Sequence, residues 1–357
     1  MKLLQHGIVR IALALAANGL AIPAALAQTY VFTELATPDR ANSVARGLSD
    51  SGNSAGRSGT TFSTKTKAFV SRGGNRFELI GGGGLPEGDY SSAFGINDRD
   101  EVVGGANTGA SLQAFLWDPS RGMQLLGTLP GDNASQAFAI NNRGEVVGYS
   151  SGPTGTRAFI WTRNGGIESL GVLPGGTASM AFAISTNGRV VGKSTSTAGV
   201  RGFYWAHSRG MRDLGVLPGH TESHAMGVNE NGTVVGFSGD GQQSQGFVWD
   251  ERSGMSPLER FAGGLVSRAL AVNNRGDIVG FSTGPDHGYH AVFWDKNGKV
   301  FDLNKAVVPA GAILLLEAHA VNSSGQILAY GFRLPLDPDG HEKPGRMFLL
   351  TPVGPRP

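Results

Sequence analysis

Residues 140–148 read INNRGEVVG, and residues 272–280 repeat the same order of residue types as VNNRGDIVG. Five further copies, two of them degenerate, begin at Ile96, Ile184, Val228, Leu48 and Val321. Successive copies start 48, 44, 44, 44, 44 and 49 residues apart. A near-constant period of this length indicates a repeat architecture, in which each repeat is one supersecondary unit.

A second motif follows each nonamer, and a third closes several of the repeats. The second is an aromatic segment, AFLW at residues 114–117 and AFIW at residues 158–161, which recurs at 202–205, 246–249 and 291–294 and more weakly at 68–70 and 347–349. All five tryptophans of the chain lie in these segments. The third motif, Leu-Gly-x-Leu-Pro-Gly, starts at Leu126, Leu170 and Leu214. Together the motifs define seven repeats of about 44 residues.

Each repeat contains four short runs with the composition of β-strands, separated by turn residues. In one copy these runs are residues 137–140, 145–149, 158–161 and 167–170. Asn and Gly lie between the first two runs, where a tight hairpin needs backbone with positive φ. We therefore expect one four-stranded antiparallel sheet for each repeat.

The first strand of a repeat divides its side chains by size. Phe138 and Ile140 point to one face of the expected sheet, whereas Ala137 and Ala139 point to the other. Radial stacking lets the bulky face of one sheet cover the thin face of the next, which buries both faces. The sequence predicts an all-β fold: a seven-bladed β-propeller of four-stranded antiparallel blades.

The two ends of the chain are expected to complete one blade. The seventh repeat ends after its third strand, residues 347–350, and an unassigned strand at residues 30–35 precedes the first repeat. We expect this N-terminal strand to close the ring, because closure removes the exposed edges of an open sheet. The alternative is an open solenoid of β-repeats, which needs capping units at its ends.

Residues 1–27 have the features of a secretory signal peptide, with Lys2 and Arg10 in a basic start, an apolar run from residue 11 and small residues near Ala27. Cleavage after Ala27 leaves residues 28–357 as a single propeller domain, secreted or periplasmic. The alternative is a retained membrane anchor, although the apolar run is short for a bilayer. After removal of the signal we expect no membrane span, and we expect a monomer.

Composition excludes several classes of function. The formal net charge is +2 and charged residues make up 16% of the chain, without a basic block, so nucleic acid is not an expected partner. Cysteine is absent, so neither disulfides nor thiolate chemistry contributes. The sequence contains no phosphate-binding loop, nucleophile elbow, zinc-protease helix or calcium loop. We expect no cofactor.

These repeats resemble the HAF repeat, a family of probable extracellular bacterial repeats named for a His-Ala-Phe signature. The signature reads QAF at residues 113–115, RAF at 157–159 and HAV at 290–292. The resemblance implies export and a repeat fold, and it brings no settled activity and no catalytic residues. One repeat also resembles a WD repeat through Gly219-His220 and Trp249-Asp250, but the other repeats depart from that pattern.

The first strands, which line the centre of a propeller, are expected to offer no catalytic pair. Residues 92–97 and their equivalents are read as apolar or small residues ending in Asn or Ser, with His319 as the sole ionisable exception. A lone histidine on a strand is more often a packing residue than a general base.

Polar residues of interest lie instead in two connecting loops of neighbouring repeats, where we name six candidate ligand-face residues: His220, Glu222, His224, Asp286, His287 and His290. They are candidates for a ligand or metal site, and the alternative is that they are ordinary solvated loop residues. The hairpin tips on the opposite face carry Arg interleaved with Asp and Glu. Two interpretations of this face remain: a surface that binds an anionic polysaccharide, and an ordinary soluble face of mixed charge.

The sequence favours an exported, non-catalytic propeller that acts as a binding or scaffold module. Dissimilar loops on a uniform frame motivate this prediction, because loops on a rigid scaffold usually carry function. The expected partner is an extracellular carbohydrate or a cell-surface protein. The alternative is an extracellular hydrolase or lyase that acts on a polymer such as a polysaccharide, with the loop histidines as working groups.

Overall fold

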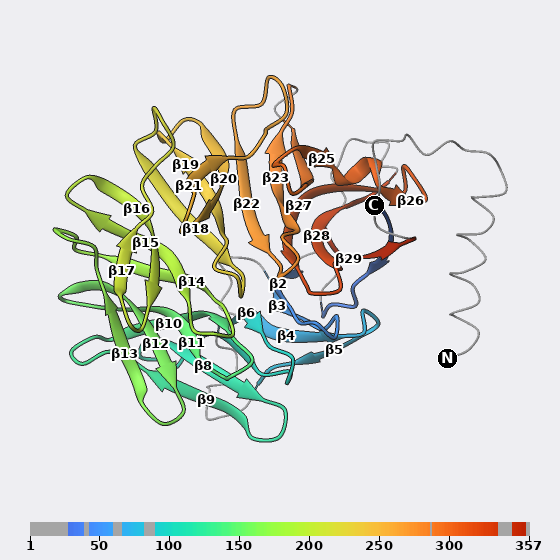
Figure 1. Ribbon diagram of the computed structural model, residues 1–357. Helices are drawn as coiled ribbons and strands as arrows, with labels where there is room; N and C mark the ends of the chain where they lie inside the picture. The colour runs from blue at the N-terminus through green and yellow to red at the C-terminus, as the bar shows by residue number, and fades with distance from the viewer. Residues whose placement is uncertain are drawn as a thin grey trace.

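The computed structural model describes residues 28–38, 43–59, 66–81, 90–285, 288–334 and 345–354. These residues form seven antiparallel sheets arranged as blades around a common centre (Figure 1). The predicted seven-bladed β-propeller is confirmed. The expected signal peptide, residues 1–27, lies outside the described residues. Within the described ranges, no helix has the length and apolar character needed to cross a membrane.

Six blades consist of four consecutive strands each. Blades 1 and 2 contain β2 (Ser43–Leu48), β3 (Ser54–Ser58), β4 (Lys67–Arg72), β5 (Arg76–Leu79), β6 (Ser91–Ile96), β7 (Val102–Asn107), β8 (Leu112–Asp118) and β9 (Gly122–Gly127). Blades 3 and 4 contain β10 (Ala134–Ile140), β11 (Val146–Gly152), β12 (Gly155–Thr162), β13 (Gly166–Gly171), β14 (Ser179–Ile184), β15 (Val190–Ser196), β16 (Gly199–Ala206) and β17 (Gly210–Asp213). Blades 5 and 6 contain β18 (Glu222–Val228), β19 (Val234–Gly239), β20 (Ser244–Asp250), β21 (Gly254–Pro257), β22 (Ser267–Val272), β23 (Ile278–Thr283), β24 (Tyr289–Trp294) and β25 (Val300–Asp302).

The seventh blade joins the two ends of the chain. It contains β27 (Ile313–Val321), β28 (Ile327–Arg333), β29 (Arg346–Val353), β1 (Thr29–Glu34) and β26 (Val307–Val308). Strand β1 pairs antiparallel with β29 from Thr29 opposite Val353 to Glu34 opposite Phe348, which confirms closure by the N-terminal strand. Two features differ from the expectation. Strand β29 is longer than residues 347–350, and β26, which follows a short 3-10 turn (η1, Leu303–Lys305), adds a fifth strand parallel to β1.

The core lies between neighbouring blades, but the first strand does not divide its side chains as expected. Because Phe138 is a bulge residue, Ala137 and Ile140 pack toward blade 2 and Ala139 packs toward blade 4. One cluster joins Ala114 and Leu116 of blade 2 to Ala137, Phe159 and Trp161 of blade 3. The phenylalanine of the aromatic segment is fully buried in six blades, at Phe69, Phe115, Phe159, Phe203, Phe247 and Phe348. Burial of one large aromatic side chain in each blade supplies much of the apolar stabilisation.

Buried serines connect each blade to the next. Ser135, at the start of blade 3, accepts a hydrogen bond from the Ala114 N–H of blade 2 at 2.9 Å and donates to Gly127 O at 2.6 Å. Ser179 and Ser223 repeat both bonds in the following blades. These bonds satisfy a backbone donor of the third strand that would otherwise be buried unpaired.

Every first strand contains a β-bulge, and in six blades the last glycine of the nonamer lies opposite it, whereas blade 7 has Ala329 there. In blade 3 the register shifts between Ala137 and Ala139, so that Phe138 is the extra residue, and Gly148 of the second strand lies opposite. A Cβ atom on Gly148 would overlap Gln136 O and press on Ala137 Cα. The glycine is therefore required because the bulged strand occupies the space of a side chain.

Candidate ligand site at the centre of the ring

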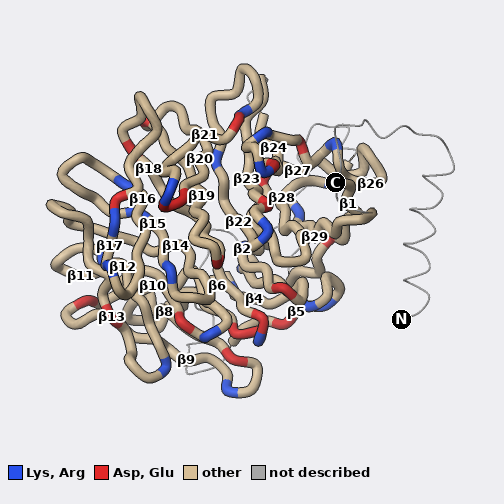
Figure 2. The backbone as a smooth tube through the Cα atoms, in the orientation of Figure 1, with Lys and Arg blue, Asp and Glu red and all other residues tan. Residues whose placement is uncertain are grey.

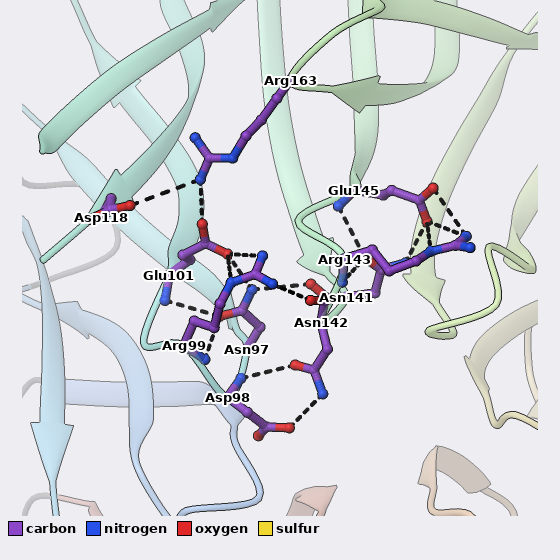
Figure 3. A network of polar contacts seen from close by, with 10 residues as sticks. All are labelled: Asn97, Asp98, Arg99, Glu101, Asp118, Asn141, Asn142, Arg143, Glu145 and Arg163. Carbon is purple, nitrogen blue, oxygen red and sulfur yellow. Dashed lines mark hydrogen bonds and ion pairs between the residues drawn. The ribbon is translucent and has the colours of Figure 1, made fainter. Parts of the chain in front are cut away.

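The asparagine of the nonamer forms a belt of hydrogen bonds at one end of the ring. Figure 3 shows two of its members, Asn97 and Asn141. Asn141 Oδ1 accepts the backbone N–H groups of Arg143 and Glu145, both at 3.0 Å, which fixes the hairpin turn. Its amide donates to Ser185 O of the next blade at 3.0 Å, and Asn97 donates in the same way to Asn141 O at 3.1 Å. The belt crosses the closure point through Asn322, which donates to Ser49 O at 3.1 Å.

A cavity of about 220 Å³ opens at this end, lined by the belt residues. The carboxylates that line this cavity accept hydrogen bonds from backbone N–H groups of adjacent blades. Asp50 accepts from Ser323 N, and Glu230 accepts from Thr186 N, both at 2.7 Å. Asp98 accepts from Asp50 N at 2.7 Å. These acids hold neighbouring hairpins together, so they are structural in character.

Ion pairs reinforce the same end of the molecule. The Glu101 side chain is only 5% exposed, and it binds Arg99 at 2.7 Å and Arg163 of the next blade (Figure 3). Burial raises the pKa of Glu101, but hydrogen bonds from Asn97, Arg99 and Arg163 outweigh burial, so the net pKa is lowered. Similar pairs join Arg143 to Glu145. Figure 2 shows basic and acidic residues interleaved over the blades, in keeping with a mixed face.

The bulges place one residue of each blade at the ring centre. The first strands of neighbouring blades contact one another around the whole ring. Their seven bulge residues are Arg46, Phe94, Phe138, Phe182, Met226, Leu270 and His319. Bulges often re-aim side chains next to functional sites. Because every blade contributes one such residue, the ring centre is the point where differences between the repeats converge.

One half of the ring centre is aromatic. The rings of Phe94 and Phe138 meet edge to face with centroids 5.3 Å apart, and Phe138 and Phe182 lie 5.7 Å apart. Tyr149 of the second strand packs against Phe138 at 5.7 Å and donates a hydrogen bond to Gln136 at 3.2 Å. All three phenylalanines remain partly exposed, unlike the fully buried phenylalanines between the blades.

The other half is ionisable, which corrects the expectation that His319 stands alone. Arg46 takes the bulge position of blade 1, and three charged or titratable side chains lie two residues before the bulge in blades 5, 6 and 7: His224, Arg268 and Glu317. The sequence already indicated the place of Arg46, because this residue aligns with Phe138 in the repeat. What the strand pattern did not reveal was that a bulge exposes this position to the ring centre.

His319 and Glu317 form a pair at the closure of the ring. His319 Nδ1 lies 2.9 Å from Ala45 O of blade 1, and Nε2 lies 3.0 Å from Glu317 Oε2. Both partners accept, so both nitrogens donate when the ring is protonated. The hydrogen bond from His319 lowers the pKa of Glu317 against the opposing effect of burial, and the charges of His319, Arg46 and Arg268 lower it further.

Arg46 has a different environment from the arginines of the hairpin tips. Its guanidinium makes no hydrogen bond or ion pair with any residue in the described ranges. Protein surrounding the side chain, together with the like charge of Arg57, lowers its pKa, and Glu317 and Tyr90 oppose this shift. The Arg46 side chain is nevertheless exposed to solvent, and Arg57 is half-buried.

Arg268 and His224 lie on either side of one aromatic ring. The Arg268 guanidinium lies over Phe237 at 4.2 Å, and His224 stacks on Phe237 at 4.6 Å with the rings 11° from parallel. Arg268 Nε is buried without a hydrogen-bond partner. Burial lowers the pKa of His224, as do the charges of Lys193 and Arg268, whereas Glu222 raises it. His224 is consequently neutral at pH 7.

The six candidates from the connecting loops separate in the structure. Glu222 and His224 lie in β18, 3.8 Å apart, and belong to the ionisable half of the ring centre. His220 lies in the loop before β18 with Nδ1 buried and unbonded. His290 lies in β24, where its Nδ1 is 3.4 Å from Asp302. Asp286 and His287 lie outside the described residues.

A metal site does not emerge from these side chains. The described part of the chain contains no group of three or more His, Asp or Glu residues placed to hold a metal ion. His224 interacts with residues of β15, β18, β19 and β22, whereas His290 interacts with Asp302 and Phe261.

Comparisons with known proteins support the architecture. No family model and no curated protein matches this sequence. Among solved structures, virginiamycin B lyase from Staphylococcus aureus is similar over 91% of this chain and 100% of its own, with 10% identity and a TM-score of 0.56. TolB from Acinetobacter baumannii matches 85% of this chain and 64% of its own, with 12% identity and a TM-score of 0.47. AofleA from Arthrobotrys oligospora matches 77% of this chain and 89% of its own, with 11% identity and a TM-score of 0.44. At such identities the likeness to the first protein shows a shared fold alone.

Proposed function

We propose that the protein is an exported, non-catalytic binding module of the HAF-repeat type, and that its ligand binds at the ring centre. One observation carries this proposal. The residue before each bulge is alanine in all seven blades, at Ala45, Ala93, Ala137, Ala181, Ala225, Ala269 and Ala318, whereas the bulge residues comprise five different amino acids. The alanines of the frame are thus the same in every repeat, whereas the bulge residues at the ring centre differ. This is expected of a scaffold that carries a specific site.

The contacts of the two ring-centre histidines, His319 and His224, favour binding over catalysis. Both nitrogens of His319 are already engaged, by Ala45 O and by Glu317, so neither is free to take a proton from a substrate. His224 stacks flat on Phe237 beside Arg268. Export is proposed from the features of residues 1–27.

The second candidate is a hydrolase or lyase acting on an extracellular polymer. It is favoured by Glu317, whose lowered pKa keeps the carboxylate ionised at the ring centre, where it is able to act as a base. This candidate requires the proton to reach Glu317 directly, because His319 already occupies one oxygen.

A paired measurement tests the proposal. Purified residues 28–357 are applied to a glycan array and to a pull-down from the native envelope, as wild type and as Phe138→Ala. We expect retained partners to be lost from Phe138→Ala and kept by Leu125→Ala, an exposed residue of blade 2. Retention by both variants would place binding elsewhere.

A turnover screen against glycans, esters and peptides, with and without divalent metals, addresses the second candidate. We expect no turnover. Turnover that disappears in Glu317→Gln would replace the binding proposal with the enzyme. Metal-dependent turnover lost in His287→Ala would do the same and would move the site to the connecting loops.

A further inference from the structure

We infer that the ligand is a neutral saccharide, one of whose sugar rings lies against Phe138 and hydrogen-bonds through its hydroxyl groups to the amide of Gln136. This inference rests on the proposed function, and it names the class of ligand that the same site takes. It follows from a row of partly exposed aromatic rings, from an oriented side-chain amide beside that row, and from a glycine that makes room for the amide.

The bulges of blades 2, 3 and 4 form a continuous row of aromatic rings. The ring centroids of Phe94 and Phe138 are 5.3 Å apart, and those of Phe138 and Phe182 are 5.7 Å apart. All three rings are partly exposed to solvent. Aromatic surface is costly to leave in water, and covering it with a ligand is favourable. The row therefore indicates where the apolar part of a ligand lies.

Gln136 provides a polar group beside the middle ring of this row. Its Oε1 accepts a hydrogen bond from the Tyr149 O–H at 3.2 Å, and the Tyr149 ring packs against Phe138 with centroids 5.7 Å apart. Burial raises the pKa of Tyr149, so the phenol keeps the proton that it donates. Within the described residues, Nε2 of Gln136 donates no hydrogen bond. Its two N–H groups are therefore held beside Phe138 and are available to a ligand.

A single glycine makes room for the Gln136 side chain. Gly105 of blade 2 lies opposite Ser92, and a Cβ atom on it would lie 3.3 Å from both Cγ and Nε2 of Gln136. The equivalent residues of the other six blades all have side chains: Arg57, Tyr149, Lys193, Phe237, Phe281 and Tyr330. The place of Gln136 thus depends on a departure from the repeat, which is expected of a specific site and not of the frame.

These features match the chemistry of an uncharged sugar ring. A pyranose has an apolar face of C–H groups, which packs on an aromatic ring, and a rim of hydroxyl groups, which form hydrogen bonds at its edge. Aromatic rings beside a few fixed polar groups are typical of small-ligand sites. The hydrogen bonds and ring contacts of the Phe138, Gln136 and Tyr149 side chains within the described residues involve no charged group. This half of the ring centre therefore favours a neutral ligand.

Calorimetric titration of residues 28–357 with neutral tetrasaccharides tests the inference. The probes are the β-linked tetramers of glucose, mannose, galactose and N-acetylglucosamine, and the tetramer of galacturonate is the charged comparison. We expect at least one neutral probe to bind. Added salt should leave its affinity unchanged, because salt screens only interactions between charges.

Gln136→Met is the decisive variant, because it keeps the length of the side chain and removes its amide. It should weaken saccharide binding about tenfold, the effect of losing one hydrogen bond at the upper end of the usual range. Gln124→Met, at an exposed position of β9, is the matched control and should leave binding unchanged. Equal affinities of Gln136→Met and wild type would overturn the inference.

Two further measurements report on Gln136 itself. Its side-chain amide resonances, which are identified by their absence from Gln136→Met, should shift when the saccharide is added. Gly105→Ala should weaken binding several-fold, because its methyl group displaces Gln136, and it should have no further effect in Gln136→Met. The neighbours of this methyl group are flexible side chains, so the variant should fold. Unshifted resonances, or an equal effect of Gly105→Ala in both backgrounds, would overturn the role of the amide.

The outcomes separate this inference from the function on which it rests. Binding of the galacturonate tetramer alone, lost in Phe138→Ala, would overturn the neutral ligand and keep the binding module. A protein partner that is retained from the envelope and lost in Phe138→Ala, with no saccharide bound, would do the same. Saccharide binding that neither Phe138→Ala nor Gln136→Met weakens would overturn both, because the site would lie elsewhere. Binding to no saccharide, with no partner retained from array or envelope, would also overturn both.

Discussion

In six of the seven repeats a single glycine gives the first strand room to bulge, and the bulge decides which residue reaches the ring centre. Gly148 and its five glycine equivalents lie where the bulged strand crosses, and a side chain there would overlap a backbone oxygen. The seventh repeat has Ala329 at this place and bulges at His319 nonetheless. In the other six repeats the glycine allows the backbone arrangement that turns residues such as Phe138 and Arg46 toward the ring centre.

Gly148→Ala is expected to destabilise the protein by about 3 kcal/mol, the upper end of ordinary overpacking costs. Gly210→Ala is the matched control, because Gly210 has a φ of +70° and open space around the position of a Cβ. It should cost only the left-handed backbone penalty of about 1 kcal/mol. Urea unfolding of both variants measures the difference. Equal costs would contradict the close approach at Gly148.

Glu101→Gln is expected to remove part of the acid sensitivity of the fold. Since the folded pKa of Glu101 is lowered, its ionised form stabilises the protein above the unfolded pKa, about 4.3, and this stabilisation is lost as the pH falls toward the folded value. Unfolding free energies of wild type and variant should therefore differ at pH 7 and converge below about pH 4.

Glu145→Gln is the control for this pH series. Glu145 holds the same place in blade 3, but its side chain is 21% exposed, and residue 207, the equivalent of Arg163, is histidine. Its substitution should therefore cost less unfolding free energy at pH 7 than that of Glu101. A Glu101→Gln curve parallel to that of wild type throughout would contradict the network role of Glu101.

At the scale of the strand and the hairpin, the nonamer does more than form a turn. Asn141 both shapes its own hairpin and reaches the next blade, and its equivalents connect five of the seven repeats to the following one in this way. Ser49 and Ser185 take this place in two blades, and each accepts a belt bond through its carbonyl oxygen. The hairpins are therefore the connecting elements of the ring as well as its inner edge.

Asn273→Ala should cost about 3 kcal/mol, because each buried polar group left unpaired costs about 1–3 kcal/mol. Asn273 accepts the N–H groups of Arg275 and Asp277 at 3.0 Å and donates to Asn322 O at 2.9 Å. Asn274→Ala, at the exposed neighbouring position, should cost less than about 1 kcal/mol. Thermal unfolding of the two variants distinguishes a structural belt from an incidental one, for which both costs would be small.

The sequence was sufficient to predict the structural elements that recur in every repeat, and it was insufficient to predict those that occur only once. The period, the hairpins and the strand at residues 30–35 follow from residues that recur, or from a strand left without a partner. Strand β26 and the extension of β29 occur once, so no second copy indicates them. The candidate site was partly missed for the same reason: Arg46 and Arg268 differ from their equivalents, and their approach depends on bulges, which a two-residue periodicity does not predict.

At the scale of the whole molecule, the ring is closed by a pair of strands from opposite ends of the chain. The belt and the His319 contact to Ala45 also cross this closure point. Closure is therefore supported at three levels: the outer strands, the ring centre and the hairpin tips. The candidate site spans it, since Arg46 lies in blade 1 and Glu317 in blade 7.

Deletion of residues 28–36 should lower the melting temperature by many degrees or cause association, because the edge of β29 becomes exposed. Deletion of residues 349–357 removes most of the β29 pairing with β1 and part of its pairing with β28, so it should be at least as harmful. A synthetic peptide of residues 28–36, added in excess, should restore part of the loss by strand addition. An N-terminal deletion that stays monomeric with an unchanged melting temperature would exclude the closed ring.

The pairing of β1 with β29 has a consequence for how the molecule is made. Thr29 and Val353 are 324 residues apart in sequence and are hydrogen-bonded in the fold. Strand β1 is synthesised before β29 and must wait for it, and contacts of such separation form slowly. A chain that stops before β29 leaves β1 without its partner and its backbone open to proteases. The seventh blade is therefore assembled only after β29 has been synthesised, and only then does the closed ring hold Arg46 of blade 1 beside blade 7.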